Sequence, residues 1–219
     1  MPTIYLLFST AFFVLVLSTP SLLDARDRNP PSVCSYELQV WNTQIRTSVM
    51  KKQVRHAYGE LLKSEIDPVT GCTVCSEDQV TITVPPLSPF SVCFKLAPKI
   101  GSLIEHLVRE GEPINTVIGY RVIRSRGPAD SAGNRTEFSN HSFGTAIDIN
   151  PEQNGLYENC THFGPECRLL RGGEWRPGTP GSLEKNSDIV VLFKQKGFKW
   201  GGEIAGRQKD FMHFSMTGY

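Results

Sequence analysis

Charge is missing from the beginning of this 219-residue sequence, because none of its first 23 residues is Asp, Glu, Lys or Arg. Residues 4–17 form a strongly apolar run, and small and turn-forming residues follow it. This pattern predicts a secretory signal peptide over residues 1–23, cleaved near Ser21, or an uncleaved N-terminal anchor. No second long apolar run exists, so we expect a membrane contact only if this segment is retained. In both cases the rest of the chain is expected to be secreted, periplasmic or on the cell surface.

The sequence also lacks an excess of either charge, with 23 basic and 22 acidic side chains. Without a basic stripe, nucleic acid is not an expected partner. Internal repeats and low-complexity tracts are absent as well, and no feature indicates an oligomeric state. The roughly 190 residues that follow the apolar segment are enough for one domain with a hydrophobic core.

Cysteine is present in an even number, at positions 34, 72, 75, 93, 160 and 167. In an exported chain this predicts disulfide bonds, although six cysteines allow 15 pairings. Cys160 and Cys167 flank a short loop and are expected to pair with each other. Cys72 and Cys75 form a C-x-x-C motif, but no second such motif and no thioredoxin-like strand accompanies it. We therefore favour disulfide bonding over a zinc ribbon or a redox function for these two residues.

Three segments have the spacing of amphipathic helices. Apolar side chains recur at steps of three and four over residues 36–64, which predicts one long or two broken helices. Residues 100–108 form a clear apolar stripe that ends at Gly111. A third helix is predicted from Ser187 to Lys196, with Ile189, Leu192 and Phe193 pointing inward and Gly197 as its left-handed stop.

Strands are predicted where apolar and polar residues alternate or where apolar runs are short, at residues 80–84, 115–123, 145–150 and 211–216. Residues 124–138 are rich in Gly, Pro, Asp and Ser and are expected to form a loop, and residues 151–181 to form a long surface insertion. The fold class is therefore α+β, with two or three helices packed on a small, mainly antiparallel sheet.

Two short segments contain the residue types of a catalytic metal site. The first places His141 in a turn and Asp148 on the following strand, and the second contains His213. Three nitrogen and oxygen ligands leave one corner of a tetrahedral zinc ion open for water, as in catalytic sites. The alternative for the first segment is a carboxylate that caps a turn and a histidine that is simply hydrogen-bonded. The joint occurrence of the two segments favours the metal site.

Asp210 stands three residues before His213, where a turn would let it lean over a metal-bound water and act as general base. The alternative is that Asp210 forms only a surface ion pair with Arg207 or Lys209. His106 lies on the predicted helix over residues 100–108 and is interpreted as a structural residue.

These segments resemble the zinc D-alanyl-D-alanine carboxypeptidase family, which includes VanY-like enzymes and the related L-alanyl-D-glutamate endopeptidases. The similar text begins with Tyr120-Arg121 and Ser139-x-His141-x-x-Gly144-x-Ala146-x-Asp148. It continues with residues 197–202 (GFKWGG) and ends with Asp210-x-Met212-His213-Phe214. Residue types, order and spacing agree over residues 113–216.

The resemblance implies a Zn²⁺ ion bound by His141, Asp148 and His213, with Asp210 as general base. It implies that Arg121 acts on the scissile carbonyl or holds a substrate carboxylate, with Arg124 as the alternative arginine. Ser139 and Trp200 are implied to line the substrate site, or else to be a turn hydroxyl and a core aromatic residue. It also implies a fold similar to hedgehog modules and D-Ala-D-Ala peptidases, in a zinc peptidase domain over residues 99–219 that follows a cysteine-containing region over residues 24–98.

The expected function is hydrolysis of peptidoglycan stem peptides by a water molecule that the metal activates. The sequence leaves open whether a terminal D-alanine or an internal bond is cleaved. Two other hypotheses are a zinc-binding cell-wall or signalling module without peptidase turnover, and a disulfide-bonded wall-binding protein without a metal.

Overall fold

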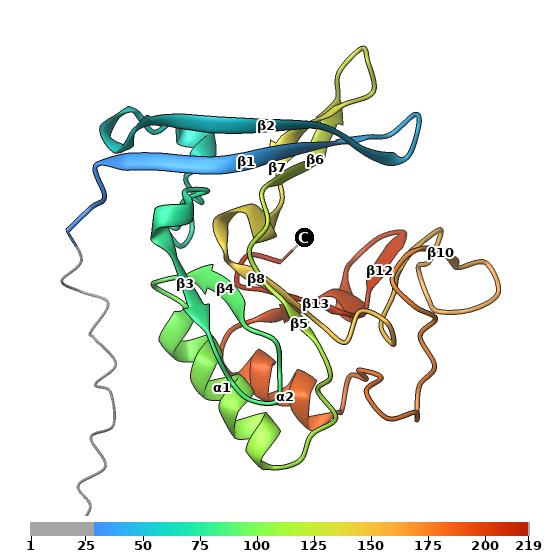
Figure 1. The fold of residues 1–219 in the computed structure, drawn as a ribbon. Helices are drawn as coiled ribbons and strands as arrows, with labels where there is room; N and C mark the ends of the chain where they lie inside the picture. Colours follow the sequence, from blue (N-terminus) through green and yellow to red (C-terminus); the bar gives the residue numbers. More distant parts are fainter. Residues whose placement is uncertain (1–28, 219) are drawn as a thin grey trace, which may run out of the picture.

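The computed structural model describes residues 29–218 of the protein (Figure 1). The predicted signal peptide or anchor over residues 1–23 lies outside these residues. Over the described part of the chain, no helix has both the length and the apolar character needed to cross a membrane.

The N-terminal half contributes a long hairpin to a four-stranded sheet with the order β2-β1-β6-β7. Its strands are β1 (Val33–Asn42), β2 (Thr47–Ala57), β6 (Ile123–Ala129) and β7 (Arg135–Phe138). β1 is antiparallel to β2 and parallel to β6. The N-terminal hairpin therefore lies beside a segment that is distant in the sequence, because Gln39 pairs with Ile123 (Figure 1).

The prediction of helices over residues 36–64 is wrong. Tyr36, Leu38 and Val40 alternate with more exposed residues along β1, which is the period of a strand with one buried face. Ile45, part of the supposed helical stripe, is 64% exposed in the hairpin turn. The apolar side chains at three- and four-residue steps therefore do not share one face, and pairing with β2 and β6 decides the local structure.

The prediction of a loop over residues 124–138 is also wrong, because this segment forms the β6–β7 hairpin. Its polar composition is compatible with strands since its outer part is exposed on both faces. The pairing contains register shifts between Arg124 and Arg126 and between Arg126 and Ala129. Such bulges change the direction in which neighbouring side chains point.

A second four-stranded sheet lies in the centre of the molecule, with the order β11-β13-β8-β5. Its antiparallel strands are β5 (Val117–Ile118), β8 (Ala146–Ile149), β11 (Lys199–Trp200) and β13 (His213–Ser215). The strands predicted at residues 145–150 and 211–216 are confirmed in shorter form. His213 stands directly opposite Asp148 across the β8–β13 pair, so two chemically important side chains lie side by side.

Two smaller sheets complete the β-structure. One has the order β10-β9-β12, with β9 (Leu156–Glu158), β10 (Arg168–Arg171) and β12 (Gln208–Asp210). The other pairs β3 (Gln79–Ile82) with β4 (Phe90–Cys93). The segment predicted as an insertion over residues 151–181 thus contains β9 and β10, and it is anchored to the centre of the molecule through β12.

Two helices, α1 (Ala97–Arg109) and α2 (Asp188–Gln195), lie together on the same side of the central sheet (Figure 1). The apolar stripe predicted for α1 is confirmed by the burial of Ile100, Leu103, Ile104 and Leu107. In α2, Val190 is fully buried, whereas Leu192 only packs at the margin of the core. Gly197 has the predicted left-handed conformation, with φ of 88°. The class predicted from the sequence, mixed α+β with small, mainly antiparallel sheets, agrees with this architecture.

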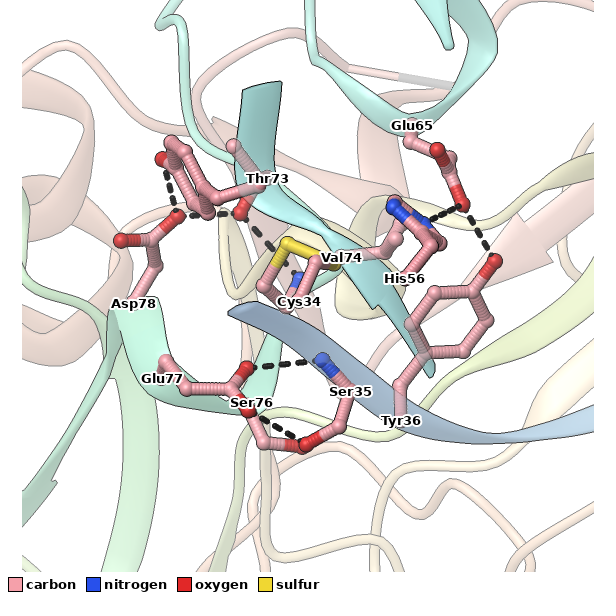
Figure 2. Close-up of a disulfide and its surroundings, with 12 residues drawn as sticks. Cys34, Ser35, Tyr36, His56, Glu65, Thr73, Val74, Ser76, Glu77 and Asp78 are labelled. Carbon is pink, nitrogen blue, oxygen red and sulfur yellow. Dashed lines mark hydrogen bonds and ion pairs between the residues drawn. A yellow bond between two sulfur atoms is a disulfide. The ribbon is translucent and has the colours of Figure 1, made fainter. Parts of the chain in front are cut away.

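All six cysteines form disulfides, which pair Cys34 with Cys75, Cys72 with Cys93, and Cys160 with Cys167. The last pair confirms the prediction, and the disulfide-bonded state of Cys72 and Cys75 is confirmed as well. The Cys34 bridge holds β1 against the turn that precedes β3 (Figure 2). The division near residue 98 stays a prediction; in the structure β1 pairs with β6, and Val92 shares one core cluster with Ile147 and Phe214.

Candidate metal centre

Three side chains from separate elements converge at one point beside the central sheet. His141 belongs to a short 3₁₀ turn (Asn140–Phe143), Asp148 to β8 and His213 to β13. His141 Nε2 lies 3.0 Å from Asp148 Oδ1 and 3.2 Å from His213 Nδ1, and the last two atoms are 3.1 Å apart. All three residues are buried. The convergence predicted from the two sequence segments is therefore present.

A backbone contact determines which nitrogen of His141 faces this point. Its Nδ1 atom donates a hydrogen bond to the carbonyl of Gly119 at 2.8 Å. In a neutral imidazole, a proton on Nδ1 leaves the lone pair on Nε2. Burial lowers the pKa of His141 to about 4, against the opposite effect of the nearby Asp148 carboxylate. The ring is therefore neutral near pH 7 and presents a ligand atom.

Asp148 carries the negative charge of the group. Burial by itself would raise its pKa, but His141, a hydrogen bond with His213 and the charge of Arg121 hold the pKa well below its usual range. Its Oδ1 atom faces the two imidazoles, and its Oδ2 atom accepts a hydrogen bond from Arg121 at 3.2 Å. The carboxylate is thus ionised and fixed in orientation from both sides.

The three atoms form a triangle that suits a tetrahedral metal ion. Zinc bonds of about 2.0–2.1 Å at tetrahedral angles separate neighbouring ligand atoms by roughly 3.3 Å. The separations of 3.0, 3.1 and 3.2 Å are close to this value. Two neutral imidazoles and one carboxylate are also a donor set that zinc accepts. These residues could hold a metal ion.

His141, Asp148 and His213, the candidate metal-binding group, open into a pocket of about 710 Å³ between the two four-stranded sheets and the β9–β10–β12 sheet. Arg121, Ser139 and Asp210 line the same pocket, as do all three candidate ligands. Asp210 ends β12 and is only 6% exposed, so its side chain is buried at the pocket and does not lie on the open surface. The structure therefore brings the predicted base, one predicted arginine and the predicted serine to the metal-binding group.

Arg124 and Trp200 are not among the described residues that line this pocket. The Arg124 guanidinium lies over the ring of Phe138, 5.0 Å from its centroid. Trp200 is buried and donates a hydrogen bond from Nε1 to the carbonyl of Phe211 at 2.8 Å. Its position agrees with the alternative of a core aromatic residue.

The glycines next to Trp200 explain the remaining motif residues. A Cβ atom on Gly201 would lie 2.1 Å from the carbonyl oxygen of Asp210, so only glycine lets this backbone approach. Trp200 and Gly201 thus support the segment that contains Asp210 and His213. Of the two alternatives that the resemblance left for Trp200, substrate contact and a core aromatic residue, the structure agrees with the second.

Several pocket residues escaped the sequence analysis. Asn140 is buried next to His141 and accepts a hydrogen bond from Arg126 at 2.6 Å through its side-chain oxygen. Arg46 and Arg168 both contact Glu158 on the opposite wall. For Arg126, the available signal was the run of arginines at residues 121, 124 and 126, but a loop was predicted from residue 124 onward.

The fold and this group of side chains define a mixed α+β protein with a candidate metal centre. A family model described as D-alanyl-D-alanine carboxypeptidase matches residues 132–216, and this match supports the family suspected from the sequence. The matched segment contains His141, Asp148, Asp210 and His213, whereas Arg121 and Arg124 precede it. Searches among curated proteins and among solved structures found no match.

Proposed function

We propose that the protein is an exported zinc metallopeptidase that hydrolyses peptidoglycan stem peptides, as a D-alanyl-D-alanine carboxypeptidase or an L,D-endopeptidase. The observation that carries this proposal is the convergence of His141, Asp148 and His213 in one pocket with Asp210 and Arg121. The family match over residues 132–216 supports the peptidase class.

The proposal also includes the domain boundaries and the location of the protein. We assign residues 99–219 to a peptidase domain of the hedgehog and D-Ala-D-Ala peptidase type, residues 24–98 to a cysteine-containing N-terminal region, and residues 1–23 to a signal peptide or anchor. The three disulfides support export, because such bonds persist in oxidising compartments. The expected location is therefore periplasmic, secreted or at the cell surface.

His141 Nε2, Asp148 Oδ1 and His213 Nδ1 would hold the zinc ion. When bound, zinc polarises a peptide carbonyl and lowers the pKa of a water molecule toward neutrality. The buried, neutral state of His141 and the ionised state of Asp148 keep His141 Nε2 and Asp148 Oδ1 free of protons near pH 7.

Asp210 is the proposed general base. Its carboxylate lines the pocket and would accept the proton of the attacking water, then deliver it to the nitrogen of the departing amine. Arg121 would hold Asp148 in place and stabilise the negative charge that develops on the carbonyl oxygen, or bind a terminal carboxylate. Ser139 is the proposed substrate contact beside them.

The test combines zinc quantification of the purified protein with mass spectrometry of digested stem peptides, for the wild type and for Asp210→Ala. For the wild type, we expect one zinc ion per chain and the release of a defined product from the stem peptide, either D-alanine or a dipeptide. The variant should keep the zinc ion, and its kcat should fall at least about a hundredfold, as is typical when a general base is removed. Zinc binding without any product would instead identify a binding module, and products that persist in the variant would remove Asp210 from its role.

A further inference from the structure

The pocket at the candidate metal centre concentrates positive charge in a protein that is nearly neutral as a whole. Six arginines line it, against three carboxylates, although the whole chain carries a formal net charge of only +1. The arginines come from three elements of the pocket wall and from the residues beside them, at positions 46, 121, 126, 135, 168 and 171. A concave surface with an excess of one sign of charge raises the local concentration of ligands of the other sign.

Of four of these arginines, three form ion pairs with carboxylates and one contacts a neutral group. Arg121 is paired with Asp148, and Glu158 is shared by Arg46 and Arg168. Arg126 donates to the neutral amide oxygen of Asn140. Over residues 29–218, Arg126 has no carboxylate within ion-pair distance.

Arg135 is similar, because its guanidinium donates to the backbone carbonyl of Gly127. Both residues belong to the β6–β7 hairpin and keep a positive charge that neutral acceptors do not cancel. Glu137 stands opposite Arg126 in the strand register, but it is exposed, and the two form no ion pair in the described part of the chain. The hairpin therefore offers an unbalanced cationic wall.

The bulge in this hairpin explains why Arg126 lines the pocket. Arg124 and Arg126 are two residues apart, and in a regular strand they would share one face. The register shift between them breaks this rule: Arg124 lies over Phe138, whereas Arg126 lines the pocket and contacts Asn140. Because Asn140 immediately precedes His141, Arg126 is held at a fixed place relative to the metal-binding group.

We propose that the pocket selects acidic peptides, and that Arg126 binds a free carboxylate of the substrate that lies outside the bond to be cleaved. The planar guanidinium can hold both oxygens of a carboxylate, and Asn140 holds it in one orientation. Arg135 adds to the same cationic wall. This inference rests on the proposed peptidase function and names the class of peptide that the site takes.

The experiment compares two peptides of equal length that differ only in an internal glutamate or glutamine. Binding is measured with zinc-loaded Asp210→Asn protein, which leaves the peptides intact, and turnover is measured with the wild type. The acidic peptide should bind about tenfold more tightly, as expected for one charge-assisted contact. Adding Arg126→Gln should bring the ratio of the two dissociation constants to about one, and Arg126→Lys should keep part of it.

Arg109→Gln is the matched control, because it removes the same charge from the exposed end of α1, outside the pocket. It should leave the preference unchanged. If Arg126 only supported the fold, Arg126→Gln would weaken binding of both peptides equally and leave their ratio intact, which would overturn the inference. Equal binding of both peptides by the unmodified pocket, or tighter binding of a polyphosphate chain than of the acidic peptide, would overturn it too.

The two proposals fail in different ways. Preferential binding of the acidic peptide without cleavage by the wild type would refute the peptidase function and keep the acidic-peptide site. Cleavage of both peptides with equal kcat/KM and equal affinity would keep the peptidase function and refute the site. Zinc content and thermal unfolding of each variant show that the metal centre and the fold are intact.

Discussion

The indole N–H of Trp200 donates a hydrogen bond to the carbonyl of Phe211, with 2.8 Å between the two heavy atoms. Phe211 lies between the proposed base Asp210 and the candidate ligand His213, so this bond holds the segment that carries both. A buried tryptophan outside the pocket thereby fixes the position of two residues inside it.

Replacing this tryptophan tests the relationship. Trp200→Phe keeps most of the buried apolar surface but removes the donor, so the free energy of unfolding should fall by about 1–2 kcal/mol. The peptidase kcat should fall about tenfold or more because Asp210 is displaced. Trp175→Phe is the comparison variant, because Trp175 stacks on the ring of Phe211 but donates its indole hydrogen bond, at 2.8 Å, to the carbonyl of Leu183 instead. An equal loss of kcat in the two variants would contradict a positioning role for Trp200.

Arg121 is expected to act on the candidate metal ligand Asp148 as well as on substrate. Arg121→Gln should lower zinc affinity about 10- to 100-fold, as is typical when a partner of a ligand is lost. Competition with a chromogenic chelator measures this without any substrate. Arg124→Gln, whose guanidinium lies over Phe138, should leave zinc affinity unchanged. If Arg121→Gln lowers kcat/KM at unchanged zinc affinity, the contact with Asp148 has no part in metal binding.

The disulfides should contribute unequally to stability. Cys72 and Cys93 are separated by 21 residues and are fully buried, and Cys160 and Cys167 are separated by seven. Loop closure gives about 3 kcal/mol for the first bridge and about 2 kcal/mol for the second. Urea denaturation of the two double Cys→Ala variants should therefore show the larger loss for the Cys72–Cys93 pair, increased further by the cavity in the core. The reverse order would show that local strain, rather than loop length, dominates.

A buried carboxylate near the first disulfide should make stability depend on pH (Figure 2). Glu65 accepts hydrogen bonds from the Tyr36 hydroxyl at 2.6 Å and the Leu62 N–H at 2.8 Å, and its Oε1 lies 3.1 Å from His56 Nε2. Burial opposes ionisation, but these contacts outweigh it, so the pKa of Glu65 lies below its ordinary value. A lowered pKa contributes stability above the pKa of the unfolded chain, and this contribution is lost as the pH falls through the folded value.

Glu65→Gln should therefore lower the free energy of unfolding by about 2 kcal/mol at pH 6, as expected for lost hydrogen bonds to a charged group. The difference from the wild type should shrink as the pH falls below about 4. The pKa of His56 is raised, chiefly by its backbone hydrogen bond and by Glu65, so its contribution is lost in the opposite direction, as the pH rises through the raised value. Chemical denaturation across pH 3–8 measures both trends, and a difference that does not depend on pH would contradict an ionised Glu65.

The candidate metal ligands could be found from the sequence because they lie in two short segments with characteristic residue types and spacing. His141 and Asp148 belong to one turn and strand. His213 is the third candidate ligand, and the proposed base Asp210 stands three residues before it. The helix over residues 97–109 was also predictable, since one apolar stripe at helical spacing has few alternatives. Strand β1 was not, because its apolar residues fit two periods and only the partner strands favour one of them.

The sequence alone determined which residues can bind a metal, that six cysteines would form disulfides, and that the chain mixes helices with small sheets. The tertiary structure decided the pairing of four of those cysteines, the choice of Arg121 over Arg124 as the pocket residue, and the supporting position of Trp200. Each of these depends on contacts between residues far apart in the chain. The bulge in β6 changes the direction of the Arg126 side chain, and Gly201 allows the backbone of Asp210 to approach closely. Neither effect can be recognised from the neighbouring residues in the sequence.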